Sequence, residues 1–297
     1  MPHPGFRFVL AVLLAVASLG ALGAGGTRRA GDAPDASGDH GDTGGSGEDA
    51  GANDASLGDA PPVSCADPID LVFVLDVSTS MAAEASRLHD GIGSIFAAAD
   101  ALTPDHRFGL VVFVDDALVV NGCSSFATAA ELQAEFERWR AFCASNDNPG
   151  GSPGGNADCA ENSLDAMFAA ATSCTWRAGA THIVIHVTDD TFEEPPYTYS
   201  GTFGGGVPAV HHYSQVVDAL VSREIRVGAF AMEVPEDCGA GTSADTARGF
   251  FTPFFGMPSF PEATGGRVWS IADVRAGTVD MATVIGDLIA GEHCTVF

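Results

Sequence analysis

Short apolar runs rich in Val, Ile, Leu and Phe recur between residues 69 and 271 of the chain. Runs of this kind, with few polar residues between the apolar ones, are typical of strands that are buried on both faces of a sheet. We therefore predict five strands, at Ile69–Leu75, Phe108–Val114, Thr181–Val187, Ile225–Met232 and Arg267–Ile271. A short antiparallel edge strand is expected at Ala117–Val120, after the turn at Asp115-Asp116.

Between these runs, apolar residues recur at spacings of three and four, which is the pattern of helices with one buried face. The predicted helices are Ala82–Leu102, Ala127–Phe142, Ala160–Ser173, His211–Ser222 and Gly277–Ala290. Strands that alternate with helices favour an α/β fold with a mostly parallel sheet. We expect a doubly wound sheet with helices on both faces.

The first 64 residues have a different pattern. Arg7 precedes an unbroken apolar run that ends in small residues, so residues 1–23 are interpreted as a signal peptide; an uncleaved signal anchor is the alternative. Residues 24–64 are rich in Gly, Ala and Asp and are expected to form a disordered linker. The folded domain is then 65–297. We expect a secreted, periplasmic or cell-surface protein without a membrane span after cleavage.

The chain is strongly acidic. It has 39 Asp and Glu residues against 13 basic residues, all of them Arg, and a formal net charge of -26 at pH 7. Binding to nucleic acid requires a basic surface that neutralises phosphates, and anionic lipid heads are repelled by the same negative charge. The composition therefore excludes nucleic acid as a partner.

Polar residues gather where three predicted segments reach the carboxyl edge of the sheet, which is the edge where ligands bind in such folds. Asp76-x-Ser78-x-Ser80 follows the first strand and Thr188-Asp189-Asp190 follows the strand at Thr181–Val187. The third segment is Asn156-x-Asp158-x-x-Glu161, before a helix. Small oxygen ligands at these spacings can face one hard cation. The alternative for Asp-x-Ser-x-Ser alone is a helix N-cap.

These motifs, taken in order, resemble a von Willebrand factor type A domain, and within that superfamily the integrin β-subunit I-like domain. The similarity runs from Asp70 to about Ile289 and includes Arg107–Asp115 and the strand at Ile225–Met232. The resemblance implies a metal-ion-dependent adhesion site for Mg²⁺ or Mn²⁺, held by Asp76, Ser78, Ser80, Glu161 and Asp189. It also implies a neighbouring site suited to Ca²⁺, formed by Asp115, Asn156, Asp158, the carbonyl of Ala160, and Glu161.

The chain departs from the family at a third cation position, where paired acids are replaced by Ala83 and Glu84. The resemblance implies an exported, cation-dependent binding module that captures a protein ligand through an acidic side chain or a C-terminal carboxylate. An accessory scaffold of an envelope assembly, with a purely structural metal, is the alternative. We do not expect an enzyme, because no His-Glu-x-x-His, Gly-x-Ser-x-Gly or Walker motif is present.

Seven cysteines in an exported chain predict disulfides with one thiol left over. Cys65 and Cys294 bracket the fold, and domain termini often lie close together, so we expect this pair to be bonded. Cys174 matches a cysteine of the integrin β domain whose family partner is absent here. Its candidate partners are Cys123, Cys143 and Cys159.

Four other features are given structural interpretations. The aromatic segment Phe250–Phe260 is expected to be a buried flap rather than a partner surface. His182 and His186 are expected to serve packing rather than metal binding, and His211-His212 to begin a helix. The Gly-rich segment Gly201–Gly206 is expected to be a flexible rim of the binding face and not a phosphate site.

Overall fold

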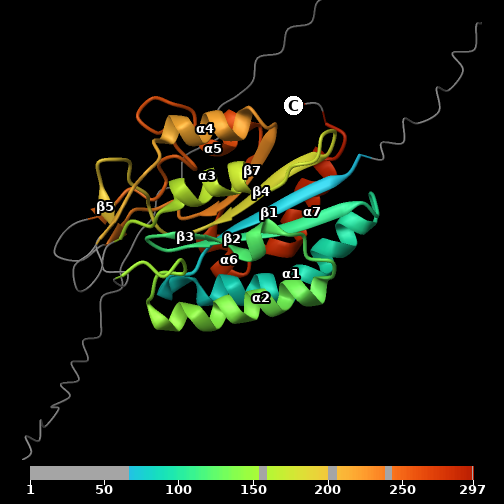
Figure 1. The fold of residues 1–297 in the computed structure, drawn as a ribbon, viewed down its shortest axis with the longest axis horizontal. Helices are drawn as coiled ribbons and strands as arrows, with labels where there is room; N and C mark the ends of the chain where they lie inside the picture. The colour runs from blue at the N-terminus through green and yellow to red at the C-terminus, as the bar shows by residue number, and fades with distance from the viewer. Residues whose placement is uncertain (1–66, 154–158, 200–205, 238–242, 296) are drawn as a thin grey trace, which may run out of the picture. The chain divides into compact units, whose positions relative to one another are not determined.

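The computed structural model describes residues 67–153, 159–199, 206–237, 243–295 and 297. The predicted signal peptide and linker lie outside these ranges. A six-stranded sheet with the order β10-β7-β4-β1-β2-β3 forms the centre of the domain (Figure 1). Its strands are β1 (Ile69–Asp76), β2 (His106–Phe113), β3 (Ala117–Val119), β4 (Thr181–Val187), β7 (Ile225–Ala231) and β10 (Arg267–Ser270). All neighbours are parallel except β3, which is antiparallel to β2. The predicted α/β class and edge strand are confirmed.

Helices cover both faces of this sheet, as Figure 1 shows. One face carries α1 (Ala82–Asp100), α2 (Ala129–Phe142), α6 (Ile271–Ala276) and α7 (Met281–Glu292). The other carries α3 (Ser163–Ser173), α4 (Tyr213–Val221) and α5 (Phe260–Thr264). Alternate residues of β1 serve the two cores: Phe73 packs with the first set of helices and Val74 with the second. A strand buried on both faces needs this unbroken apolar sequence.

The register of the central strands places several loops at one edge. Asp76 at the end of β1 lies beside Phe113 of β2, and Leu75 lies beside Val187 of β4. The chain leaves all three strands in the same direction because they are parallel. The loops that carry the predicted ligands therefore begin side by side.

Capping residues explain where the structure differs from the predicted helix boundaries. α3 begins at Ser163 because the side chain of Asn162 accepts the amide of Asp165. α7 begins at Met281, capped by Asp280, so the residues before it are not part of that helix. The separate helix α6 ends at Ala276 and is followed by the cap residue Gly277, whose φ of 75° suits glycine. Neither α6 nor α5 was predicted, because one or two turns are too short to give a clear period.

Smaller elements complete the described chain. They are the 3₁₀ turns η1 (Thr79–Met81), η2 (Val120–Cys123) and η3 (Cys143–Ser145) and the paired strands β5 (Thr198–Tyr199) with β6 (Val207–Pro208) and β8 (Glu236–Asp237) with β9 (Ser243–Ala244). No helix within the described ranges is both long and apolar enough to cross a bilayer.

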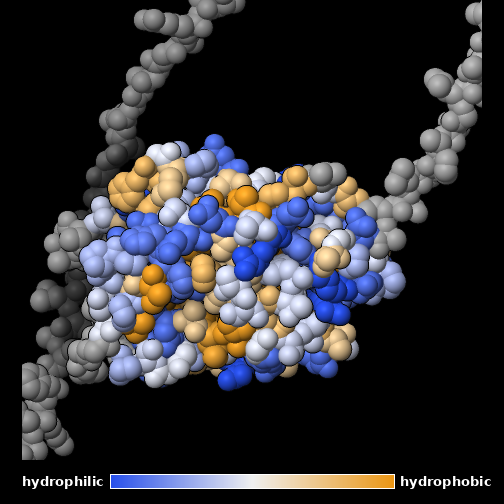
Figure 2. Space-filling model, turned by 45° about the horizontal axis from the view of Figure 1, so that its top comes forward, coloured by the Kyte–Doolittle hydropathy of each residue, from blue (hydrophilic) through white to orange (hydrophobic). Residues whose placement is uncertain are grey.

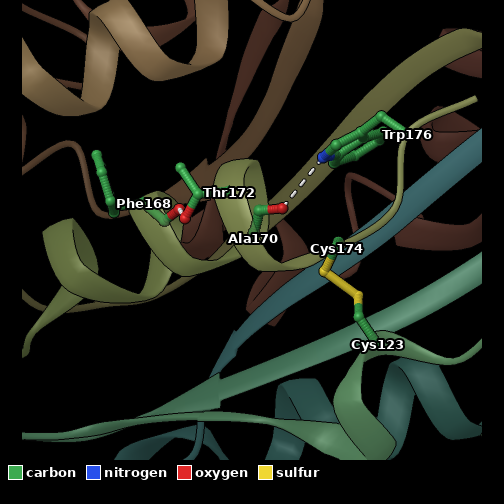
Figure 3. Close-up of a disulfide and its surroundings, with 6 residues drawn as sticks. All are labelled: Cys123, Phe168, Ala170, Thr172, Cys174 and Trp176. Atoms are coloured by element: carbon green, nitrogen blue, oxygen red, sulfur yellow. Dashed lines mark hydrogen bonds between the residues drawn. A yellow bond between two sulfur atoms is a disulfide. The ribbon is translucent and has the colours of Figure 1, made fainter. Parts of the chain in front are cut away.

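A disulfide between Cys123 and Cys174 joins η2 to the end of α3 (Figure 3). This selects Cys123 among the three candidate partners of Cys174. Near the bridge, the indole Nε1 of Trp176 donates a 3.1 Å hydrogen bond to the carbonyl of Ala170. Cys143 is buried and free, as expected of one leftover thiol. Cys294 is disulfide-bonded, and its pairing with Cys65, which lies outside the described residues, stays a prediction.

The first prediction concerns this bridge. The two cysteines are 51 residues apart, so removing the bridge increases the conformational freedom of the unfolded chain. Cys123→Ala/Cys174→Ala should lose about 4 kcal/mol of unfolding free energy in urea titrations, according to the chain-entropy relation. Cys143→Ala, which deletes a buried thiol without a cross-link, is the control. Equal losses in the two variants would show that the bridge contributes no more than packing.

Candidate metal centre

The carboxylate of Asp76 lies at the end of β1 and is completely buried. Its Oδ1 accepts the amide of Ser78 at 2.8 Å, and its Oδ2 accepts the hydroxyl of Thr188 at 2.7 Å. The first bond turns the chain back just after the strand. The second joins the turn to the loop after β4. The orientation of Asp76 is therefore set from two strands at once.

The two serine hydroxyls of this turn are not used to cap a helix. Neither η1 nor α1 has a side-chain hydrogen bond at its N-cap. Instead, Ser80 Oγ donates to Asp189 Oδ1 at 2.8 Å, and the hydroxyls of Ser78 and Ser80 are 3.1 Å apart. Ser78 is buried and Ser80 is exposed, so this row of oxygens runs from the interior to the surface. The geometry argues against the N-cap alternative.

Three buried carboxylates meet beside these hydroxyls. Asp76, Glu161 and Asp190 each offer one oxygen, and these atoms all lie within 4.8 Å of one another. Glu161 is held in place because its amide donates to the carbonyl of Thr191 at 2.9 Å, while Ala160 forms a bridge with the same residue. This arrangement can bind a metal ion.

Asp190 belongs to this group although it was not among the predicted ligands. The sequence offers two successive acids after β4, and successive side chains of an extended chain point to opposite sides. The pattern alone therefore cannot say which acid faces the cluster. The carboxylate of Asp189 instead contacts Ser80 and an arginine.

That arginine is Arg275 of α6, which sequence reasoning did not identify. Its Nη2 donates to Asp189 Oδ2 at 2.6 Å, and its Nε donates to Glu84 Oε1 at 2.9 Å. Glu84 is completely buried and Asp189 nearly so, whereas about a third of the Arg275 side chain is exposed. Burial alone would lower the pKa of Arg275, but its hydrogen bonds to the two acids raise that pKa above its ordinary value. The guanidinium is thus permanently charged.

Asp76 is repelled by the neighbouring acid Asp189. Burial and the neighbouring charge of Asp189 raise the pKa of Asp76 to about 7, although the bonds from Ser78 and Thr188 act in the opposite direction. The repulsion and the burial therefore outweigh two good hydrogen bonds. A positive ion placed among these oxygens would remove this cost.

The predicted second site is only partly within the described residues, since Asn156 and Asp158 fall outside them. Asp115 follows β2 and is buried. The backbone amide of Asp115 donates to the side-chain oxygen of Asn148 at 3.1 Å, and the backbone carbonyl of Asp115 accepts from Asn162 Nδ2 at 2.9 Å. These contacts fix the loop near Ala160. The Ca²⁺ cage itself stays a prediction.

The histidine and aromatic motifs have the predicted structural roles. His186 lies between the rings of Phe113 and Phe250, and burial lowers its pKa to about 3. Phe250, Phe254 and Phe260 are buried, which confirms a flap, while Phe255 at its tip is 76% exposed.

Two further histidine interpretations also hold. His212 is the N-cap of α4, so this motif begins a helix as expected. Both ring nitrogens of His182 contact backbone carbonyls, those of Arg223 and Arg177. Of the segment Gly201–Gly206, residues 201–205 lie outside the described residues.

Comparisons with known proteins give similarity of fold only. No family profile matches the sequence, and a search of curated proteins finds no match. Among solved structures, the chain is similar to an aerotolerance-related membrane protein from Bacteroides fragilis carrying multiple mutations to serines. The identity is 16%, the TM-score is 0.43, and 75% of this chain and 98% of that chain are covered.

Two other solved structures are similar to the chain. One is the conserved hypothetical protein BatB from Bacteroides thetaiotaomicron, with 14% identity, a TM-score of 0.45, and coverage of 76% of this chain and 100% of that chain. The other is proximal thread matrix protein 1 from the mussel byssus, with 13% identity, a TM-score of 0.38, and coverage of 57% and 39%. Similarity at this level carries no functional inference.

Proposed function

We propose that this chain is an exported, divalent-cation-dependent binding module that captures a carboxylate of a partner protein. The observation that carries the proposal is the meeting of three buried carboxylates, from Asp76, Glu161 and Asp190, at the edge where parallel strands end. Hydroxyls that cap no helix lie beside them. Carboxylate and hydroxyl oxygens are the donors that Mg²⁺, Mn²⁺ and Ca²⁺ prefer.

The residues present fit a divalent cation. Asp76, Ser78, Ser80 and Glu161 would hold it, with Asp189 acting directly or through water as predicted, and Asp190 would join them. When bound, such an ion supplies positive charge and room for one more oxygen ligand. The Ser78–Ser80 turn brings this position to the surface, because Ser80 is exposed while Ser78 is buried. An acidic side chain or a C-terminal carboxylate of another protein would complete the site.

An enzymatic role receives no support from the obvious candidate for a nucleophile. Ser163 Oγ and His186 Nε2 are 3.2 Å apart, as a serine activated by a histidine would require. Both residues are completely buried, however, and His186 is enclosed by aromatic rings. No substrate can reach this pair in the fold described.

Export is the second part of the proposal. The Cys123–Cys174 disulfide is consistent with folding in an oxidising compartment. The signal peptide at 1–23, the linker at 24–64 and the domain at 65–297 are proposed on the sequence pattern. The protein would be secreted, periplasmic or attached at the cell surface.

The alternative is a structural metal in an accessory scaffold of an envelope assembly. The complete burial of Asp76 and Glu161 favours it, because a purely structural ion is normally enclosed by protein ligands. The two functions differ in what is lost on chelation. A scaffold would lose stability but keep its partner until it unfolds, whereas a binding module would lose its partner at once.

The second prediction tests the cation. Mg²⁺ or Mn²⁺ at 100 times its Kd should stabilise the parent protein by about 2.7 kcal/mol, measured as a rise in melting temperature. Asp76→Ala should abolish most of this rise. Asp287→Asn removes an exposed acid of α7 and should leave the rise unchanged. Equal gains in the parent and in Asp76→Ala would exclude the assigned ligands.

The third prediction concerns the metal-free protein. Because Asp190 adds a like charge within 4.8 Å of two buried carboxylates, Asp190→Asn should raise the unfolding free energy in EDTA by about 1 kcal/mol. The same variant should gain less from Mn²⁺ than the parent does. A loss of stability in EDTA, compared with Asp287→Asn, would contradict repulsion within the cluster.

The fourth prediction tests partner capture. A pull-down from native extracellular material should recover a partner with Mg²⁺ and release it with EDTA at a temperature where the domain stays folded. Changing the contacting carboxylate of the partner to its amide should remove most of the affinity. NaCl should weaken binding little, since the acidic domain does not attract an acidic partner at long range. Retention of the partner in EDTA would favour the scaffold.

A further inference from the structure

Arg275 is the one cationic side chain that forms an ion pair with the acids at this edge, among the residues that the structure describes. It reaches them from α6, whereas Glu84 belongs to α1 and Asp189 follows β4. Its Nε is 2.9 Å from Glu84 Oε1 and its Nη2 is 2.6 Å from Asp189 Oδ2. One guanidinium therefore bridges two carboxylates, which its planar donors suit.

The bridge has a consequence for Asp189. One of its oxygens accepts from Arg275 and the other accepts from the hydroxyl of Ser80 at 2.8 Å. Both oxygens of the carboxylate are thus engaged. Since Ser80 gives its proton to Asp189 and accepts that of Ser78 at 3.1 Å, one lone pair of its Oγ remains available to a cation. Arg275 fixes Asp189, and Asp189 in turn orients a ligand hydroxyl.

We propose that Arg275 is a positioning residue that holds Asp189 back from the bound cation and so limits the negative charge that the partner's carboxylate meets there. This role rests on the proposed function. Asp76, Glu161 and Asp190 already bring three negative charges together. These three charges already exceed that of a divalent cation, so a fourth carboxylate bound directly would repel an incoming anion more strongly, and the charge of Arg275 opposes this.

The position of Arg275 fits this role better than that of a simple clasp between helices. An ion pair with Glu84 alone would join α6 to α1, yet Nη2 turns to Asp189 with the shorter contact. The side chain is 35% exposed, whereas Glu84 is fully buried and Asp189 is 7% exposed. Its charge therefore acts at the surface, where the partner's carboxylate would arrive.

The test compares Arg275→Gln with Arg107→Gln. Arg107 carries the same charge but lies at the start of β2, the opposite end of the strands. The affinity for Mn²⁺ is measured by electron paramagnetic resonance. Acetate serves as the carboxylate probe, and its binding is measured by proton relaxation, because acetate displaces water from the bound Mn²⁺. Arg275→Gln should bind Mn²⁺ about tenfold more tightly and acetate several-fold more weakly. Arg107→Gln should match the parent in both.

In Arg275→Gln the affinity for Mn²⁺ should rise while the affinity for acetate falls. If Arg275 were only structural, both affinities would fall together. Because Arg275→Gln leaves Glu84 buried without its partner, Glu84→Gln/Arg275→Gln is measured as well and should show the same two changes with a stable fold. If the parent binds Mn²⁺ but both Arg275 variants behave like Arg107→Gln, the role of Arg275 is wrong. If the parent binds no Mn²⁺, the metal site itself fails, and this role with it.

Discussion

The buried carboxylate of Asp76 is the contact on which the edge of the sheet depends. It accepts the amide of Ser78, just after its own strand, and the hydroxyl of Thr188 beyond β4. Thr188 is in reach only because β1 and β4 are parallel and in register up to Leu75 and Val187. A one-residue slip would reverse the side chains of β1 between the two cores and would also separate Asp76 from Thr188. The register of β1 therefore determines both the packing of the sheet and the shape of the site.

Holding the buried carboxylate of Asp76 in this position lowers the stability of the fold. A carboxylate removed from water and placed beside other acids favours its protonated form, and the pKa of Asp76 rises accordingly. Two apolar cores, one on each face of the sheet, supply the stability that such a cluster consumes. Packing alone would favour apolar residues at these positions, so the crowded acids support the proposed metal site.

The sequence predicts the scaffold well because the scaffold follows local rules. Apolar runs locate each long strand to within two residues, and alternation with helices gives the parallel sheet. Asn162 and Asp280 are ordinary N-cap residues that would have sharpened two helix starts. The short helices α5 and α6 were not predicted because a segment of one or two turns is too short to show a helical period.

The site was harder to predict because its decisive contacts join residues distant in the chain. Three predicted ligands, Ser78, Ser80 and Asp189, do lie together. The choice between Asp189 and Asp190 depends on how the chain turns after β4, where the amide of Thr188 bonds to Phe230 of β7. Arg275 is 191 residues from Glu84, and no sequence motif indicates that the two residues form a pair. Such a contact exists only once the sheet has brought α6 over α1.

The surface also limits how a partner can be recognised. On the face in Figure 2, apolar residues form small groups between hydrophilic ones. The exposed large apolar side chains among the described residues belong to separate segments: Val210, Val221, Val234, Phe255 and Phe297. Phe255 is the most exposed, and the guanidinium of Arg248 packs over its ring at 4.9 Å. Binding driven by a broad apolar patch has little basis here. The affinity of the proposed partner would then come from a few polar contacts. At the exposed end of the Ser78–Ser80 turn, hydroxyl oxygens and the fixed positive charge of Arg275 reach the surface together.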